Sequence, residues 1–172
     1  DLHLLSRRQR QMCIRDRIKT KLKKKDMIYK IKIQIFDKEE EVSAMLDTGN
    51  LLRDPISKIP VIIVEKEKLY SIIPAELLDN IEKIIGGEEI SFNNEYFSRL
   101  KILPFSSMGK QNGLMLGIKA DKIIIEKEEV EERENIIIGI SMQKLENNYS
   151  ALFGLDLLEG SESDELITII EK

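Results

Sequence analysis

The sequence has few of the residue types on which many kinds of active site depend. Its 172 residues include one histidine, one cysteine and no tryptophan, and aromatic residues make up only 5%. A zinc site takes several His, Cys or carboxylate ligands, and a serine or cysteine nucleophile needs a neighbouring base such as histidine. His3 and Cys13 give no basis for either kind of site, so a metal-dependent hydrolase is disfavoured. A single cysteine cannot form an internal disulfide, which is typical of a reducing compartment.

Long apolar runs and phosphate-binding loops are also missing. No stretch reaches the roughly 20 apolar residues that a membrane-spanning helix needs, so we expect this stretch of chain, as given, to be a soluble fragment. The only loop that combines glycine with lysine, SSMGKQNG at residues 106–113, lacks the spacing and the following helix of a P-loop. Nucleotide hydrolysis is therefore not indicated.

The first 17 residues differ in character from the rest. DLHLLSRRQRQMCIRDR has no apolar period and resembles translated adapter sequence; a disordered basic arm is the alternative. Residues 1–25 hold 10 of the 27 basic but 2 of the 31 acidic residues, which leaves 17 basic and 29 acidic residues, a net charge of −12, for the remainder. We expect residues 1–25 to be an artefact or a disordered leader and linker, residues 26–172 to form one domain, and nucleic acid not to be a partner.

The remaining sequence predicts a mainly β fold rich in isoleucine and leucine. Residues 28–36 alternate so that Ile31, Ile33 and Ile35 share one face, which is typical of a half-buried strand. Residues 37–41 predict a turn and residues 42–46 a returning, more buried strand. Further short strands are predicted at 59–65, 96–105, 113–119, 121–126, 135–141, 150–153 and 165–172, with a hairpin tip at 106–113 and a solvated acidic turn at 126–134.

One helix is predicted within this β pattern, at residues 74–87. Pro74 suits a first helical turn, and Gly86 and Gly87 suit its end. The apolar stripe of this helix comprises Leu77, Leu78, Ile81, Ile84 and Ile85. Many strands with one inserted helix predict a closed or folded-over sheet rather than a layered parallel one.

The most informative motif is SAMLDTGNLLRDP at residues 43–55. An apolar strand delivers Asp47 directly into Thr48 and Gly49, which is either an ordinary turn or half of a two-carboxylate active site. A phosphoaspartate enzyme would carry a second acid two residues on, where Gly49 stands. LDTG after an apolar strand is similar to the active-site signature of aspartic proteases of the retroviral type. Asn50 and Asp54 are interpreted as turn residues rather than substrate contacts.

Two further stretches strengthen this resemblance by their order and spacing. SSMGKQNG looks like the flap hairpin of these proteases, which would make Met108, Gly109 and Gly113 flap or substrate-binding residues. ALFGLDLLEG is similar to their apolar-apolar-Gly element, which would place Gly154 under the catalytic loop. Gly139 in IIIGIS competes for that role, but the helix-like LDLL after Gly154 favours the latter.

A closer resemblance covers residues 27 to 160. LDTGNLLRDPISKIPVIIVE, ILPFSSMGKQNGLMLGIKADKIII, IIIGIS and YSALFGLDLL are similar to the family of sporulation sigma-E factor processing peptidases. The resemblance implies a retropepsin-like closed β-barrel with an inserted helix and a short C-terminal helix. It also implies an aspartic endopeptidase, without metal or cofactor, that cleaves the N-terminal pro-sequence of a sporulation sigma factor, pro-sigma-E. In this family a multi-span membrane domain precedes the protease domain, so we expect the full-length form to be anchored in the cell membrane with this domain on its cytoplasmic side.

The mechanism that the resemblance implies needs two carboxylates, and the chain holds one such motif. We therefore expect a homodimer in which Asp47 lies beside its symmetry mate. The resemblance gives Thr48 a hydroxyl bridge to the partner loop and Gly49 a close approach of the backbone to the carboxylates. The net charge of −12 should make association weak without the membrane domain. The alternative function is a catalytically inactive retropepsin-fold domain that binds a peptide along its cleft.

Overall fold

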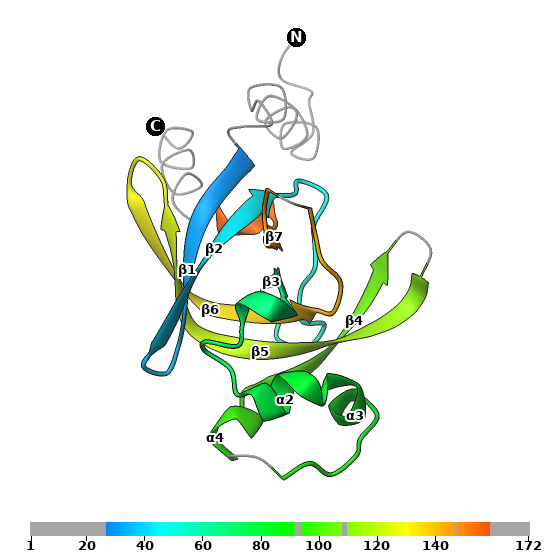
Figure 1. Ribbon diagram of the computed structural model, residues 1–172. Coiled ribbons are helices and arrows are strands. Elements are labelled where there is room, and N and C mark those ends of the chain that lie inside the picture. Colours follow the sequence, from blue (N-terminus) through cyan, green and yellow to red (C-terminus); the bar gives the residue numbers. More distant parts are fainter. Residues whose placement is uncertain (1–26, 92–93, 108–109, 147, 159–172) are drawn as a thin grey trace.

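The protein forms a seven-stranded sheet that closes on itself (Figure 1). The structure is a computed structural model and describes residues 27–91, 94–107, 110–146 and 148–158. The strands are β1 (Ile28–Ile35), β2 (Lys38–Leu46), β3 (Val61–Glu65), β4 (Leu100–Ser107), β5 (Lys110–Glu126), β6 (Val130–Ser141) and β7 (Ala151–Phe153). The helices are η3 (Lys66–Lys68), α2 (Ala75–Asp79), α3 (Ile81–Ile85), α4 (Asn94–Phe97) and η4 (Leu155–Leu157).

Strand order in the sheet is β1-β2-β7-β3-β6-β5-β4, and β1 also pairs with β5. That additional pairing closes six strands into a barrel and leaves β4 as an extra strand on β5. Figure 1 shows α2, α3 and α4 gathered at one end of the barrel, and the β4–β5 hairpin projecting from its side, on the right of the view. The predicted mainly β, retropepsin-like closed barrel is confirmed.

The first hairpin confirms the alternating pattern but corrects its turn. Ile31, Ile33 and Ile35 are fully buried in the core. The turn consists of Phe36 and Asp37 rather than residues 37–41, since residues 38–41 already lie in β2. Phe36 has a positive φ of 55°, and two contacts stabilise this backbone conformation. Its N–H donates to the Asp121 carboxylate at 2.6 Å, and its ring packs edge-on against Tyr96.

The predicted single helix is instead two short helices, α2 and α3. Asn80 separates them with a non-helical φ of −114°, and its side-chain amide donates to the Glu76 carbonyl at 2.7 Å. An Asn side chain that bonds to nearby backbone competes with helical hydrogen bonds, which explains the break. The apolar stripe still faces the core, because Leu77, Leu78 and Ile81 are buried.

Residues 113–119 and 121–126 were expected to be separate strands, but they belong to the single strand β5. Its first half pairs with β4 as far as Ile118, and its second half pairs with β1 from Lys122. Lys119, Ala120 and Asp121 lie between the two pairings, and β6 pairs with β5 on both sides of this place. The acidic run at 126–134 is also shorter as a turn than expected, because only residues 127–129 connect β5 to β6.

Some expectations concern parts of the chain that the structure does not describe. The leader at residues 1–25, the strand at 165–172 and the hairpin tip at Met108 and Gly109 lie outside the described residues. After β7 a glycine turn was predicted, but Gly154 has an extended backbone (φ −94°, ψ 169°); the helical turn predicted next is present as the 3-10 helix η4. Among the helices in the described part of the chain, none has the length and apolar character to cross a membrane.

We expect Ile33→Ala to lower the free energy of unfolding by about 2–5 kcal/mol, because it removes buried methyl groups and leaves a cavity in the core. Ile33 is 0% exposed. The matched control is Ile56→Ala, since Ile56 is 89% exposed and loses almost no buried area. Urea denaturation of both variants measures the difference, and equal effects would contradict the buried position of Ile33.

Candidate active site

Asp47 stands at the end of a short parallel strand pair. β2 and β7 pair in parallel, with Leu46 opposite Phe153. The Asp47 N–H donates to the Phe153 carbonyl at 2.8 Å, which extends this ladder by one bond. Parallel strands end at the same edge of a sheet, so the segments that follow them, Asp47-Thr48-Gly49 and Gly154, emerge side by side.

Local hydrogen bonds fix the conformation of the segment that begins at Asp47. The Gly49 N–H donates to the Asp47 carboxylate oxygen Oδ1 at 2.9 Å, and the Asn50 N–H donates to the Asp47 carbonyl at 3.0 Å. The Asn50 side-chain oxygen then accepts the Leu52 N–H at 3.0 Å. Asn50 is thus confirmed as a turn residue, and the Asp47 carboxylate has a defined orientation. Thr48 lies between them and is half-buried.

Gly154 lies directly against this segment. A Cβ atom at position 154 would stand 2.3 Å from the Asn50 carbonyl oxygen, so only glycine allows the two backbones to approach this closely. An ion pair joins the same two segments further along, because Arg53 lies 2.6 Å from the Asp156 carboxylate. Gly139, the alternative candidate, lies elsewhere in β6, where an added Cβ would meet Met115.

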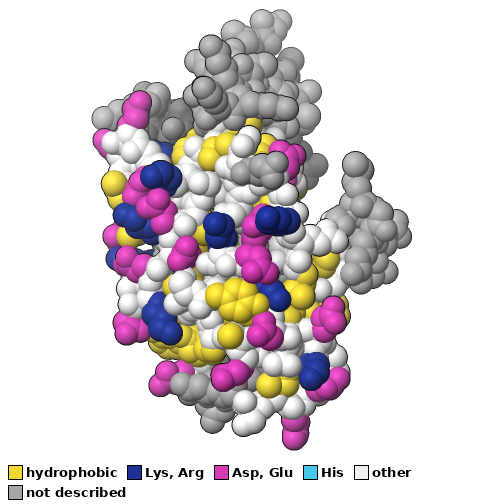
Figure 2. Space-filling view, in the orientation of Figure 1, with side chains coloured by type: hydrophobic (Ala, Val, Ile, Leu, Met, Phe, Trp, Pro, Cys, Tyr) yellow, Lys and Arg dark blue, Asp and Glu magenta, His cyan; other side chains and the backbone are white. Residues whose placement is uncertain are grey.

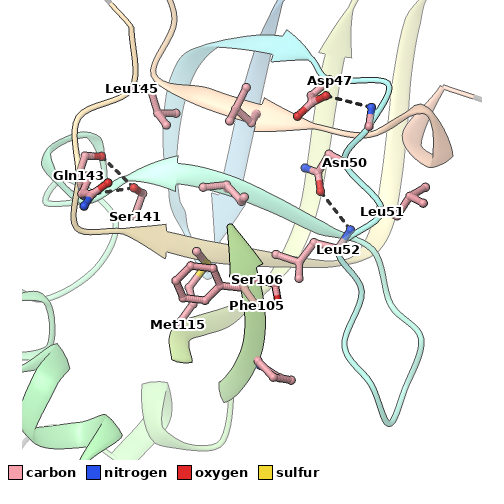
Figure 3. A pocket seen from close by; sticks show the side chains of 14 residues that line it. Asp47, Asn50, Leu51, Leu52, Phe105, Ser106, Met115, Ser141, Gln143 and Leu145 are labelled. Carbon is pink, nitrogen blue, oxygen red and sulfur yellow. Dashed lines mark hydrogen bonds between the residues drawn. The ribbon is translucent and has the colours of Figure 1, made fainter. Parts of the chain in front are cut away.

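A pocket of 570 Å³ opens beside Asp47 (Figure 3). Its floor includes Ile63 and Leu152, which are cross-strand partners in β3 and β7. The β4–β5 hairpin forms one wall, and the end of β6 with the loop after it forms another, opposite Asp47. The lining residues are Asp47, Gly49, Asn50, Leu51, Leu52, Ile63, Pro104, Phe105, Ser106, Met115, Ser141, Gln143, Leu145 and Leu152. The lining is therefore mixed: apolar side chains make up most of it, and Asp47, Asn50, Ser141 and Gln143 add polar groups.

Asp47 is the only ionisable side chain among the described residues that line this pocket. Within the described ranges no three His, Cys, Asp or Glu side chains come together as a metal site would require. A single carboxylate can accept a proton or a hydrogen bond, but it offers no second group to act as acid while it acts as base.

The predicted flap residues fall at two places. Met108 and Gly109 lie outside the described residues, between the paired ends Ser107 and Lys110 of the β4–β5 hairpin. Gly113 lies within β5, opposite Phe105, and an added Cβ would stand 2.6 Å from the Phe105 ring. Gly113 therefore leaves room for the Phe105 ring, which lines the pocket.

The base of this hairpin is packed onto the barrel by a small apolar cluster of Val61, Leu103, Met115 and Ile137. Two glycines that face each other across β5 and β6, Gly117 and Gly139, make room for it. An added Cβ would stand 2.8 Å from Leu103 at Gly117 and 2.6 Å from Met115 at Gly139. The hairpin that walls the pocket is thus fixed at its base.

Two titratable groups near the site are perturbed. The pKa of Asp54 is lowered, mainly because the Ser57 hydroxyl donates to its carboxylate at 2.5 Å, while burial opposes the shift. Asp54 is 3% exposed and holds the turn after the Asp47 segment, which confirms it as a turn residue. The pKa of Tyr149 is raised by burial, then by the carboxylates of Glu146 and Asp47.

The charged side chains form no single-sign patch on the face shown in Figure 2. Lys, Arg, Asp and Glu side chains are interspersed over the described part of that face. Elsewhere in the described part of the chain the same mixing of signs appears as salt bridges, for example Lys32 to Glu126 at 2.9 Å and Arg99 to Asp121 at 2.8 Å. This face lacks the concentrated positive charge that phosphate backbones require.

Several residues of the site were not identified from the sequence. Phe105 and Met115 lie in segments that were predicted as short strands, but which of their side chains face the pocket was not predicted. Leu145 lies in an irregular loop with no periodic signal. The Arg53–Asp156 ion pair could have been predicted from the sequence. Each residue closely follows one of the two motif segments, and their charges are opposite.

Comparison with known proteins relates the chain to sporulation factors. A family model described as Sporulation factor SpoIIGA matches residues 10–157. A Bacillus thuringiensis subsp. kurstaki protein named for sporulation sigma factor processing is 30% identical over 125 residues, 72% of this chain and 78% of that protein.

Two relatives are named Sporulation sigma-E factor-processing peptidase. The Bacillus subtilis (strain 168) protein is 30% identical over 125 residues, 69% of this chain and 40% of that protein. The Priestia megaterium protein is 28% identical over 120 residues, 67% of this chain and 38% of that protein. The chain thus matches about two fifths of the length of these two relatives. No solved structure matches the chain at a significant level.

We expect Gly154→Ala to lower the free energy of unfolding by about 1–3 kcal/mol, because the new methyl group forces the Asn50 carbonyl away. Gly86→Ala is the control, since its Cβ would come no closer than 3.3 Å to its neighbours. Urea denaturation compares the two. A loss at Gly154 no larger than that at Gly86 would contradict the close approach.

We expect Asp54→Asn to lower the thermal unfolding midpoint at neutral pH. The lowered pKa means that ionised Asp54 contributes stability above its unfolded pKa, near 3.8, and that this contribution is lost as pH falls through the folded value. The midpoints of wild type and variant should therefore converge in acid. Glu89→Gln, at an exposed position, is the control. A gap that does not depend on pH would refute the assignment.

Proposed function

The chain belongs to the sporulation factor SpoIIGA family, and we propose that it is the protease domain of an aspartic endopeptidase that removes the pro-sequence of a sporulation sigma factor. The names of two relatives give the substrate class, a sigma-E factor precursor. The observation that carries the catalytic assignment is the placement of Asp47. Its oriented carboxylate is the only ionisable group among the described residues lining a pocket large enough for peptide side chains.

The chemistry requires a second carboxylate, and we assign it to Asp47 of a second copy. Two carboxylates about 3 Å apart cannot both ionise, so they share one proton. The ionised member takes a proton from a water molecule, whose oxygen adds to the peptide carbonyl carbon, while the protonated member donates to the carbonyl oxygen. The tetrahedral intermediate then collapses and the C–N bond breaks. The leaving nitrogen takes the proton that the first carboxylate removed from water, and the second carboxylate recovers its proton from a hydroxyl of the intermediate, which becomes the new carboxylic acid.

The residues around Asp47 have supporting roles in this proposal. Thr48 bridges to the partner loop through its hydroxyl, and Gly49 orients the carboxylate through its N–H. Gly154 supports the loop from below, where it meets the Asn50 carbonyl. Met108, Gly109 and Gly113 belong to the hairpin that closes over substrate and excludes water.

We also propose that the whole protein is anchored in the cell membrane, with this domain on the cytoplasmic side where a sigma factor precursor is available. The proposal is supported by the family and by relatives whose length exceeds the matched region. The net charge of −12 on residues 26–172 opposes association of two free copies, so anchoring would favour the dimer by concentrating it.

We expect Asp47→Asn to reduce cleavage of a co-expressed pro-sigma factor by at least roughly 10²–10⁴-fold, because it removes the acid–base group. Asp37→Asn, an exposed acid in the β1–β2 turn, is the matched control and should cleave normally. Two copies joined by a flexible linker then test the shared site. A linked pair with Asp47→Asn in one copy should be inactive, although the other copy is intact.

Persistent cleavage by Asp47→Asn would refute the aspartic mechanism, and full activity of the half-substituted linked pair would refute the shared site. Mass spectrometry identifies the cleaved bond. If the wild-type protein binds the precursor without cleaving it, even as a linked pair, the domain is a catalytically inactive peptide-binding module instead.

A further inference from the structure

The loop between β6 and β7 separates two cavities. Its described residues are 142–146 and 148–150. On one side it borders the 570 Å³ pocket beside Asp47, and on the other a second pocket of 280 Å³ lined by Glu65, Lys68 and Tyr149 among others. Leu145 lines both pockets. A wall with open space on each side has little packing to hold it, so its position depends on polar bonds.

Glu65 provides the polar bonds that hold this wall. Its carboxylate oxygen Oε1 accepts the Leu145 N–H at 2.7 Å, and its own N–H donates to the Ser150 carbonyl at 2.9 Å. The end of the loop is fixed in addition by a bond from the Ser150 N–H to the Ser43 carbonyl at 2.8 Å. The backbone of Leu145 is thus tied to the barrel through one carboxylate.

Glu65 is itself rigidly placed. It is the last residue of β3, the central strand between β7 and β6, and it lies opposite Ser141 in the parallel β3–β6 pair. It is 6% exposed. A buried carboxylate that accepts a backbone N–H makes a charge-assisted bond, which is stronger and more directional than a neutral one. Burying a charged side chain at the end of a strand has a desolvation cost. Packing alone therefore does not account for a glutamate at this position.

We infer that Glu65 is a positioning residue for substrate selection, acting through Leu145. In this inference, which rests on the proposed function, Leu145 contacts a large aliphatic side chain of the substrate next to the cleaved bond. Ile63, Leu152 and Met115 line the rest of the pocket that receives it. Glu65 does not touch the substrate. It sets how far Leu145 reaches into the pocket.

The test compares Glu65→Ala and Leu145→Ala on paired peptides. Synthetic peptides span the cleaved bond and carry either leucine or alanine beside it. Both variants should weaken binding of the leucine peptide roughly 10-fold or more, the loss expected when an apolar pocket loses its contact with a side chain, and leave the alanine peptide nearly unchanged. Glu67→Ala, an exposed acid two residues further on, is the control.

Dissociation constants measured in an Asp47→Asn linked pair separate this inference from the proposed function, because they do not depend on cleavage. The double variant Glu65→Ala, Leu145→Ala should lose no more affinity for the leucine peptide than either single variant, since both changes remove the same contact with the substrate. In the cleaving linked pair the effect should appear in KM rather than kcat. Glu65→Gln, which keeps an acceptor in place, should restore most of the discrimination.

Additive losses, or equal losses for both peptides, would overturn the inference. Glu65→Asp keeps the charge but retracts the carboxylate by one methylene, so it should behave like Glu65→Ala and serves if the alanine variant does not fold. If Glu65→Ala and Glu65→Asp both unfold the domain, Glu65 is structural only and the inference fails. If the wild-type protein does not cleave the precursor, but its preference for the leucine peptide still depends on Glu65, the proposed function is refuted and this inference is not.

Discussion

The candidate site depends on the short parallel pairing of β2 with β7. Only three residues of each strand take part, yet this contact places the Asp47 segment and Gly154 at one edge of the barrel. The pairing is stabilised behind the site by Phe153, which is fully buried and meets the Tyr29 ring edge-on at 5.5 Å. In front, the Asp47 N–H to Phe153 carbonyl bond joins the ladder to the site itself. Any change that separates these strands would also separate the carboxylate from its support.

The sequence was sufficient to predict features with a local cause. The alternation of Ile31, Ile33 and Ile35 predicts a half-buried strand because the period of side chains along a strand is two. Asn50 and Asp54 were predicted as turn residues because their side chains bond nearby backbone. The closed barrel was predicted from composition and resemblance, whereas the strand order follows from pairings between residues far apart in the sequence.

The features that were missed have non-local causes. The Asn80 side chain breaks the expected helix through a hydrogen bond to the Glu76 carbonyl, although the apolar stripe favours helix along the whole segment. β5 continues from its β4-paired half to its β1-paired half because β6 pairs with it along both, from Gly117 to Glu126. In the sequence, Glu65 is only the first charged residue after an apolar run. Its hydrogen bond to Leu145 joins residues 80 positions apart. No local pattern contains such information.

If the second carboxylate comes from another copy, catalysis becomes a property of association rather than of the folded chain. The pocket of one copy contains, in its described lining, one ionisable group, and that group alone cannot serve as both acid and base. The shared proton exists only while the two carboxylates are close, so the active fraction follows the dimer population. A strongly acidic domain opposes that population, and tethering two copies on one surface raises it through effective concentration without any new contact. Control of proximity would then be sufficient to switch the peptidase on.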